Sequence, residues 1–186
     1  MTTTKIILGF AGEIASGKGT AAKYLAEHHG AATYRFSTIL RDVLRRLHLP
    51  EDRTTLQTLS TFLRKEFGED TLAKVMFEDA KNDTHSLIVV DGVRRLEDVK
   101  YLREIPEFKL CYLSAPMKTR HERLLSRGEN PDDKTKTYEQ FVKDHEGEPE
   151  REIGKLEAFA AEVIDNSGTL PELYQTLDAI VKKYGE

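Results

Sequence analysis

Short apolar runs recur along the chain, and three of the five lack the clean polar alternation of a strand with one solvated face. Apolar runs of this kind are typical of parallel strands that are buried on both faces of a sheet. The runs predicted as strands are Lys5–Ala11, Ala32–Phe36, Ser86–Val90, Phe108–Ser114 and Ala161–Asp165.

Between the apolar runs lie segments whose apolar residues recur at helical spacing. The clearest of them contains Leu56, Leu59 and Leu63, and Gly68 marks its end. The segments predicted as helices are Lys18–His29, Ser37–His48, Thr54–Phe67, Asp70–Lys81, Glu97–Glu104, Met117–Arg127 and Leu170–Tyr184.

Strands that alternate with helices predict an α/β fold, a three-layer sandwich whose five-stranded parallel sheet is joined by right-handed crossovers. The 186 residues fit a single domain, 1–186, with one sizeable core. Residues 37–84 are predicted to form a helical insertion between the second and third strands. Residues 127–137, RGENPDDKTKT, are polar and aperiodic, and this pattern predicts a short lid loop.

The composition, with 39% hydrophobic and 32% charged residues, is that of a soluble globular protein. A net charge of −4 disfavours general binding to duplexes, so no nucleic acid partner is expected. Cys111 is the single cysteine, which excludes an internal disulfide or a cysteine-based metal site and predicts a buried thiol. No apolar run approaches the ~20 residues of a membrane span. The first residues resemble no signal peptide, so we expect a cytoplasmic protein without a membrane partner.

The segment GEIASGKGT, residues 12–20, directly follows the first predicted strand and opens the first predicted helix. A phosphate-binding P-loop requires that context. Glycines let the backbone curl so that N–H groups point at phosphate oxygens, and the start of the helix adds further N–H groups. The residues predicted to bind a nucleotide here are Gly12, Ala15, Ser16, Gly17, Lys18, Gly19 and Thr20.

This loop departs from the strict P-loop pattern in one respect. Gly19 follows Lys18, so the hydroxyl arrives one residue later, on Thr20, and Glu13 adds a negative charge beside the loop. We expect Lys18 to reach the β- and γ-phosphates and Thr20 to contact Mg²⁺ or its water. Two spaced glycines, a lysine and a hydroxyl between a strand and a helix favour this interpretation over a plain glycine turn.

The third predicted strand leads into Asp91 and then into two arginines, Arg94 and Arg95. Ligands of open α/β sheets bind at the carboxyl ends of the strands, where these side chains are expected. Asp91 can hold a Mg²⁺-bound water or align an acceptor, and it can also simply cap the next segment. The guanidinium fork matches phosphate oxygens, although either arginine alone could equally form a surface salt bridge.

With these residues, the chain resembles the nucleoside monophosphate kinase group of P-loop phosphotransferases. GKGT is similar to the adenylate-kinase form of the loop, and VVDGVRR is similar to that group's Asp-Gly-x-x-Arg segment. The resemblance implies ATP and Mg²⁺ as cofactors and a contact between Arg95 and the acceptor phosphate. It also implies that Arg123 and Arg127 are lid arginines that close over the transferring phosphate.

Two further segments qualify the resemblance. After the second strand the chain is nearer to phage-type deoxynucleoside monophosphate kinases, which implies that Ser37 and Arg41 bind the acceptor. The tail AEVIDNSGT, residues 161–169, is similar to the last strand and turn of dephospho-coenzyme A kinases. In those enzymes the turn lies against the ATP adenine, which implies that Asn166 and Gly168 bind the nucleotide. Those enzymes usually carry an acidic residue where this chain has Ser37 and Thr38.

The sequence therefore predicts an ATP- and Mg²⁺-dependent kinase of a small phosphorylated acceptor. Because the acceptor phosphate is already anionic, charge stabilisation is the expected mechanism and no strong general base is needed. A nucleoside or deoxynucleoside monophosphate is the expected acceptor, with dephospho-coenzyme A as the alternative. A P-loop ATPase or switch acting on a macromolecule is the alternative of another class, and a monomer and a homodimer both remain open. The predicted catalytic residues are Lys18, Asp91, Arg95, Arg123 and Arg127.

Overall fold

The computed structural model describes residues 5–127, 133–145 and 148–185, without the side chains of Arg53, Arg127 and residues 148–151. A five-stranded sheet in the order β2-β3-β1-β4-β5 runs through the molecule, and every pairing in it is parallel. The predicted five-stranded parallel sheet is thus confirmed. The strands are β1 Ile6–Ala11, β2 Ala32–Arg35, β3 Leu87–Val93, β4 Phe108–Ser114 and β5 Glu162–Asp165.

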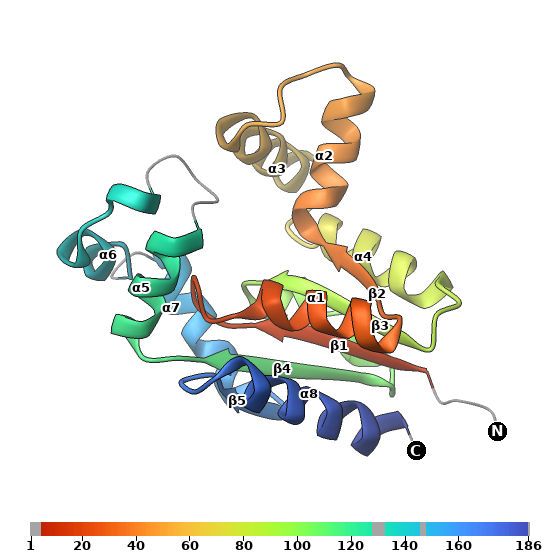
Figure 1. Cartoon of the computed structure of the whole chain (residues 1–186). Coiled ribbons are helices and arrows are strands. Elements are labelled where there is room, and N and C mark those ends of the chain that lie inside the picture. The colour runs from red at the N-terminus through yellow and green to blue at the C-terminus, as the bar shows by residue number, and fades with distance from the viewer. Residues whose placement is uncertain (1–4, 128–132, 146–147, 186) are drawn as a thin grey trace.

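Helices cover both faces of the sheet (Figure 1). The α-helices are α1 Lys18–His29, α2 Phe36–Arg46, α3 Arg53–Phe67, α4 Thr71–Asn82, α5 Met117–Arg127, α6 Tyr138–His145, α7 Glu148–Lys155 and α8 Leu170–Gly185. The short 3₁₀ helices are η1 Leu96–Val99, η2 Leu102–Glu104, η3 Asp133–Thr135 and η4 Leu156–Phe159. Among the described residues, no helix is both long and apolar enough to cross a membrane.

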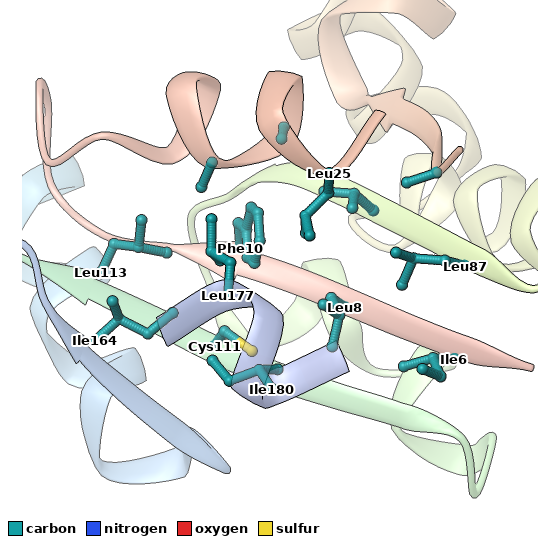
Figure 2. Close-up of a cluster of buried hydrophobic side chains, with 14 of the residues drawn as sticks. Ile6, Leu8, Phe10, Leu25, Leu87, Cys111, Leu113, Ile164, Leu177 and Ile180 are labelled. Atoms are coloured by element: carbon teal, nitrogen blue, oxygen red, sulfur yellow. The ribbon is translucent and has the colours of Figure 1, made fainter. Parts of the chain in front are cut away.

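The central strand β1 is buried along its whole length and serves two cores. Successive side chains of a strand point to opposite faces, so alternate residues of β1 belong to different cores. Leu8 and Phe10 pack with residues of α1 and α8, as Figure 2 shows. Cys111 is fully buried in the same core, which confirms the predicted core thiol, and this burial raises its pKa to about 12. Ile7 faces the second core, which contains residues of α4, η1, η2, α7 and η4.

The predicted helix at 97–104 is wrong. The chain there forms two 3₁₀ helices, η1 and η2, with Val99 and Leu102 both buried against the sheet. Val99 ends η1 and Leu102 begins η2, with a turn at Lys100 and Tyr101 between them. The i and i+3 spacing of Val99 and Leu102 suits an α-helix and a 3₁₀ helix alike, and packing against the sheet selected two short 3₁₀ helices.

Two helices of the insertion, α2 and α3, project beyond the layers that cover the sheet (Figure 1). Helix α2 buries Leu40 and Leu44, whereas no described side chain of α3 is buried. Helix α4, which lies in the same 37–84 range, packs Met76 and Ala80 into the second core. Of the predicted lid loop 127–137, residues 128–132 lie outside the described residues, and η3 lies in the remainder.

Candidate functional site

The loop between β1 and α1 is curled by an unusual run of backbone angles. Gly12 and Gly17 have φ values of 142° and 106°, and Ala15 lies in the left-handed region at 60°. A residue with a Cβ rarely adopts such angles, so the loop keeps its shape because packing around it holds it there. Gly17 is also the N-cap of α1 and makes no side-chain capping bond. The start of a helix presents its first amide groups toward an anion.

Lys18 lies back over the curled loop. Its Nζ donates to the carbonyl oxygen of Gly12 at 2.6 Å and to that of Glu13 at 2.9 Å, and it lies 3.5 Å from Ser16 Oγ. Ser16 itself is fully buried. The ammonium group is thus held beside the backbone amides that are predicted to bind phosphate.

The turn after β5 contacts the loop through a side chain. Asn166 Nδ2 donates to the carbonyl oxygen of Ser16 at 2.8 Å, and Asn166 is 5% exposed. A Cβ at position 17 would lie 2.2 Å from the same nitrogen, so glycine is required there for the close approach. Gly168 lies instead beside Glu172, whose carboxylate accepts from the amide and hydroxyl of Thr169. The structure therefore brings Asn166 to the loop, and the adenine contact stays a prediction.

Asp91 lies within β3, because that strand continues to Val93. Its register partners are Phe10 of β1 and Arg35 of β2. The Asp91 side chain is only 9% exposed, and its Oδ2 lies 2.8 Å from the Nε of Arg35. This ion pair compensates the buried carboxylate. Arg35 was not predicted as a site residue from the sequence, although its position at the end of a strand was a usable signal.

The backbone of the two arginines after β3 is held by a buried carboxylate. Asp98 is 4% exposed, and its Oδ2 accepts the N–H groups of Arg94 and Arg95 at 3.0 and 3.3 Å. The other oxygen, Oδ1, pairs with Arg64 of α3 at 3.5 Å. The Arg95 guanidinium lies 3.4 Å from a carboxylate oxygen of Glu69, and Arg94 is exposed. The backbone of this turn is thus fixed by Asp98, which was not predicted from the sequence.

Arg41 lies on α2 and is engaged by the turn that leads to α3. Its NH1 donates to the backbone carbonyl of Glu51 at 3.1 Å and to the Glu51 carboxylate at 3.3 Å. Hydrogen bonds from Arg45, and secondarily from Arg41, lower the pKa of Glu51 against the opposing effect of partial burial. Ser37 is the second residue of α2 and is exposed. The roles of Arg41 and Ser37 toward an acceptor stay predictions.

A buried arginine that was not predicted from the sequence supports the loop from the other side. Arg120 of α5 is 2% exposed. Its NH1 donates to the carbonyl of Ile14 at 3.3 Å, and its NH2 lies 3.0 Å from the Glu13 carboxylate. The same guanidinium donates to Ala115 O at 3.0 Å and to His145 Nε2 at 2.5 Å. Arg120 therefore connects the loop to α5 and α6.

The predicted lid arginines lie on the same helix as Arg120. Arg123 follows Arg120 by three residues, so the two share one face of α5. The NH1 of Arg123 is buried and has no hydrogen-bond partner among the described residues. A buried donor without a partner is costly, and an anion is a group that would satisfy it. Arg127 is the last residue of α5, and its side chain lies outside the described ones.

The oxygen ligands near the loop suit an ion that arrives with a nucleotide. Thr20 is exposed on the first turn of α1, and Asp91 carries the nearby carboxylate. Among the described residues, no group of three or more His, Cys, Asp or Glu side chains could hold a metal ion by itself. Mg²⁺ at phosphate-transfer sites is held by one or two protein oxygens together with the substrate phosphates. The residues present fit that arrangement.

A parallel sheet of this order, with a glycine loop between its central strand and α1, defines a P-loop kinase fold. Solved structures share it. A shikimate kinase from Bacteroides thetaiotaomicron superposes with a TM-score of 0.62 at 12% identity, covering 96% of this chain and 97% of that one. TT1252 from Thermus thermophilus gives a TM-score of 0.60 at 18% identity, with 97% and 98% covered.

Sequence comparison defines the family. The family model described as an AAA domain matches residues 11–140, which contain the loop, the insertion and Asp91. A UPF0200 protein of Staphylothermus marinus is 32% identical over 178 residues, covering 95% of this chain and 91% of that protein. Another, from Hyperthermus butylicus, is 30% identical over 168 residues, with 90% and 89% covered. The chain therefore belongs to the AAA domain family and to the UPF0200 proteins.

Proposed function

We propose that this protein is an ATP- and Mg²⁺-dependent phosphotransferase that moves the γ-phosphate to a small phosphorylated acceptor, a nucleoside or deoxynucleoside monophosphate. The observation that carries the proposal is the loop at 12–20. Lys18 Nζ lies 2.6 Å from Gly12 O, over a backbone curled by positive φ angles at the start of α1. Backbone N–H groups, a lysine and a helix start are the donors that bind the phosphates of a nucleotide.

On the donor side, bound ATP supplies the phosphoryl group and Mg²⁺ neutralises part of its charge. Lys18 and the loop amides hold the β- and γ-phosphates. Thr20 and Asp91 offer oxygens to the ion or to its waters. Asn166 keeps the loop in shape through its bond to Ser16 O, which has a length of 2.8 Å. These groups orient the phosphates for transfer.

On the acceptor side, arginines from two segments bind the acceptor phosphate. Arg41 belongs to α2, whereas Arg94 and Arg95 follow β3, where Asp98 holds their backbone amides. A guanidinium matches a phosphate because its fork can donate two parallel hydrogen bonds. Arg123, with its buried and unpartnered NH1, offers a donor to the charge that develops on the transferred group. Arg127 is assigned the same role.

The test is ADP release by the purified protein with ATP and Mg²⁺. The acceptors are the ribo- and deoxynucleoside monophosphates, dephospho-coenzyme A, shikimate and a blank without acceptor. Shikimate is included because solved proteins of this fold include shikimate kinases. We expect release well above the blank with one or a few monophosphates. Turnover with dephospho-coenzyme A or shikimate alone would contradict the proposed acceptor, and release equal to the blank throughout would contradict transfer to any of them.

A further inference from the structure

We infer that Arg35, which lies outside the residues assigned above, binds the terminal phosphate of the bound nucleotide. The inference rests on the proposed function and deepens it. It names the residue that distinguishes a nucleoside triphosphate from a diphosphate. Three observations carry it: the place of Arg35 in the sheet, its pairing with Asp91, and its close approach to Gly19.

Arg35 is the last residue of β2. It pairs in register with Asp91 of β3, and Asp91 in turn pairs with Phe10 of β1, two residues before the phosphate loop begins at Gly12. All three strands are parallel, so their carboxyl ends meet at one edge of the sheet. Arg35 therefore lies at the same edge of the sheet as the phosphate loop.

The ion pair with Asp91 orients the guanidinium. Arg35 Nε lies 2.8 Å from Asp91 Oδ2, and the Asp91 side chain is 9% exposed whereas that of Arg35 is 54% exposed. A guanidinium has five N–H donors in a rigid fork, more than one carboxylate can accept. Asp91 thus fixes the orientation of the Arg35 guanidinium. The N–H donors on the exposed side of that guanidinium remain for a second anion.

Gly19 shows where that exposed side lies. A Cβ at position 19 would be 3.3 Å from Arg35 NH2, closer than most real Cβ contacts. Gly19 is the second residue of α1 and is not among the glycines with positive φ, so its backbone does not require glycine. Glycine is a poor helix former, and here it makes room for the guanidinium. Gly19 and the Arg35 guanidinium therefore lie in close contact.

The guanidinium consequently lies against the first turn of α1, next to the residue that follows Lys18. Lys18 is the group expected to reach the β- and γ-phosphates. A guanidinium that is already oriented at that point binds a dianionic terminal phosphate better than a freely moving surface arginine would. Loss of the Arg35 side chain should therefore weaken the binding of a nucleoside triphosphate far more than that of a diphosphate.

The experiment compares the Mg²⁺ complexes of ADP and of the non-hydrolysable β,γ-imido analogue of ATP by calorimetry. We expect Arg35→Gln to lower the affinity for the analogue by about 10- to 100-fold and the affinity for ADP by less than about threefold. Arg35→Lys keeps the charge without the fork and should fall between wild type and Arg35→Gln. Arg46→Gln is the matched control, because Arg46 is exposed on the last turn of α2 and loses the same charge. Thermal melting establishes that each variant is folded.

A double-mutant cycle tests the contact itself. Gly19→Ala should lower the affinity for the analogue several-fold, because the new methyl group displaces the Arg35 guanidinium. In the Arg35→Gln background, the same substitution should cost little more, since the shorter side chain leaves the space open. Additive losses of affinity would overturn the assigned contact between Gly19 and Arg35.

The remaining outcomes separate this inference from the proposal on which it rests. If folded Arg35→Gln loses affinity for both nucleotides equally, or for neither, the inference is overturned and nucleotide binding by the loop stands. If wild-type protein binds neither nucleotide, the proposed function and this inference are both overturned. A loss confined to the analogue supports the assignment.

Discussion

The phosphate loop and the helical insertion are built in opposite ways. Two polar side chains hold the loop from buried positions: Asn166 and Arg120 are 5% and 2% exposed, and each donates to a carbonyl of the loop. In the insertion, no described side chain of α3 is buried, and Phe62 and Phe67 are 53% and 64% exposed. The loop is therefore held by buried polar contacts, whereas α3 is loosely packed.

The difference has a physical meaning. A loop that must present amides to phosphate gains from being held in place before the ligand arrives, because no binding energy is then spent on ordering it. An element that closes over an acceptor needs a low cost of opening, and such elements come from the less stable parts of a fold. Figure 1 shows α2 and α3 standing away from the layers, whereas α1 lies directly on the sheet.

The largest expected effect comes from breaking the loop. Lys18→Ala should lower ATP-dependent transfer by about 100-fold or more, because it removes a fixed charge next to the transferred group. The measurement is ADP release with the acceptor found in the screen. Lys23→Ala is the control, since Lys23 is an exposed residue of α1 whose ion pair is with Glu27 in the same helix. Full activity in Lys18→Ala would contradict the assignment of the loop.

Next in size is the loss of the buried arginine beside the loop. Arg120→Met should lower the free energy of unfolding by about 2–3 kcal/mol, since it strands the polar groups that Arg120 satisfies. Arg45→Met, at a residue that is 57% exposed in the insertion, should change it by less than about 0.5 kcal/mol. Urea denaturation at pH 7 measures both. Equal effects would erase the contrast between the two regions.

The stability that the contact between the insertion and the sheet provides should depend on pH. Tyr34 of β2 donates to Asp83, the C-cap of α4, at 2.5 Å. The pKa of Asp83 is lowered to about 2, because hydrogen bonds from Tyr34 and His85 outweigh the opposing burial. The pKa of Tyr34 is raised to about 12, chiefly by the same bond. The Asp83 contribution is complete above about pH 4 and is lost as the pH falls through about 2.

Asp83→Asn should therefore lower the free energy of unfolding by about 1 kcal/mol at pH 7 and flatten its decline below pH 4. Because the raised pKa of Tyr34 contributes stability below about pH 10 that is lost toward pH 12, the alkaline decline should flatten too. Urea melts across the pH range measure this. Tyr34→Phe should reproduce part of the change. An unaltered acid limb in Asp83→Asn would show that this bond does not form in solution.

The smallest effect should come from the exposed face of the insertion. Phe67→Ala should change the free energy of unfolding by less than about 0.5 kcal/mol, because little apolar area is lost from contact. Phe141→Ala, at a residue of α6 that is 1% exposed, should cost about 3–5 kcal/mol. Chemical denaturation compares the two. A loss above about 1 kcal/mol at Phe67 would mean that α3 is packed more firmly than its exposure indicates.

Much of the fold was predictable because burial leaves a local record. Parallel strands covered on both faces must be apolar throughout, and β1 and β4 are visible in the sequence for that reason. The phosphate loop was predictable because its glycines, lysine and hydroxyl are consecutive. The 97–104 segment was predicted wrongly because apolar residues at i and i+3 suit both an α-helix and a 3₁₀ helix, and packing chose between them.

The sequence alone determined the strands, the loop and the order in which candidate residues arrive at the site. Only the tertiary structure decided their partners. Asn166 contacts Ser16 across 150 residues of chain, and Arg120 contacts Ile14 across 106. Arg35 meets Asp91 because β2 and β3 are neighbours in the sheet. Periodicity reports how each residue is buried locally, whereas the partner of a charged side chain depends on which strand ends the topology brings together.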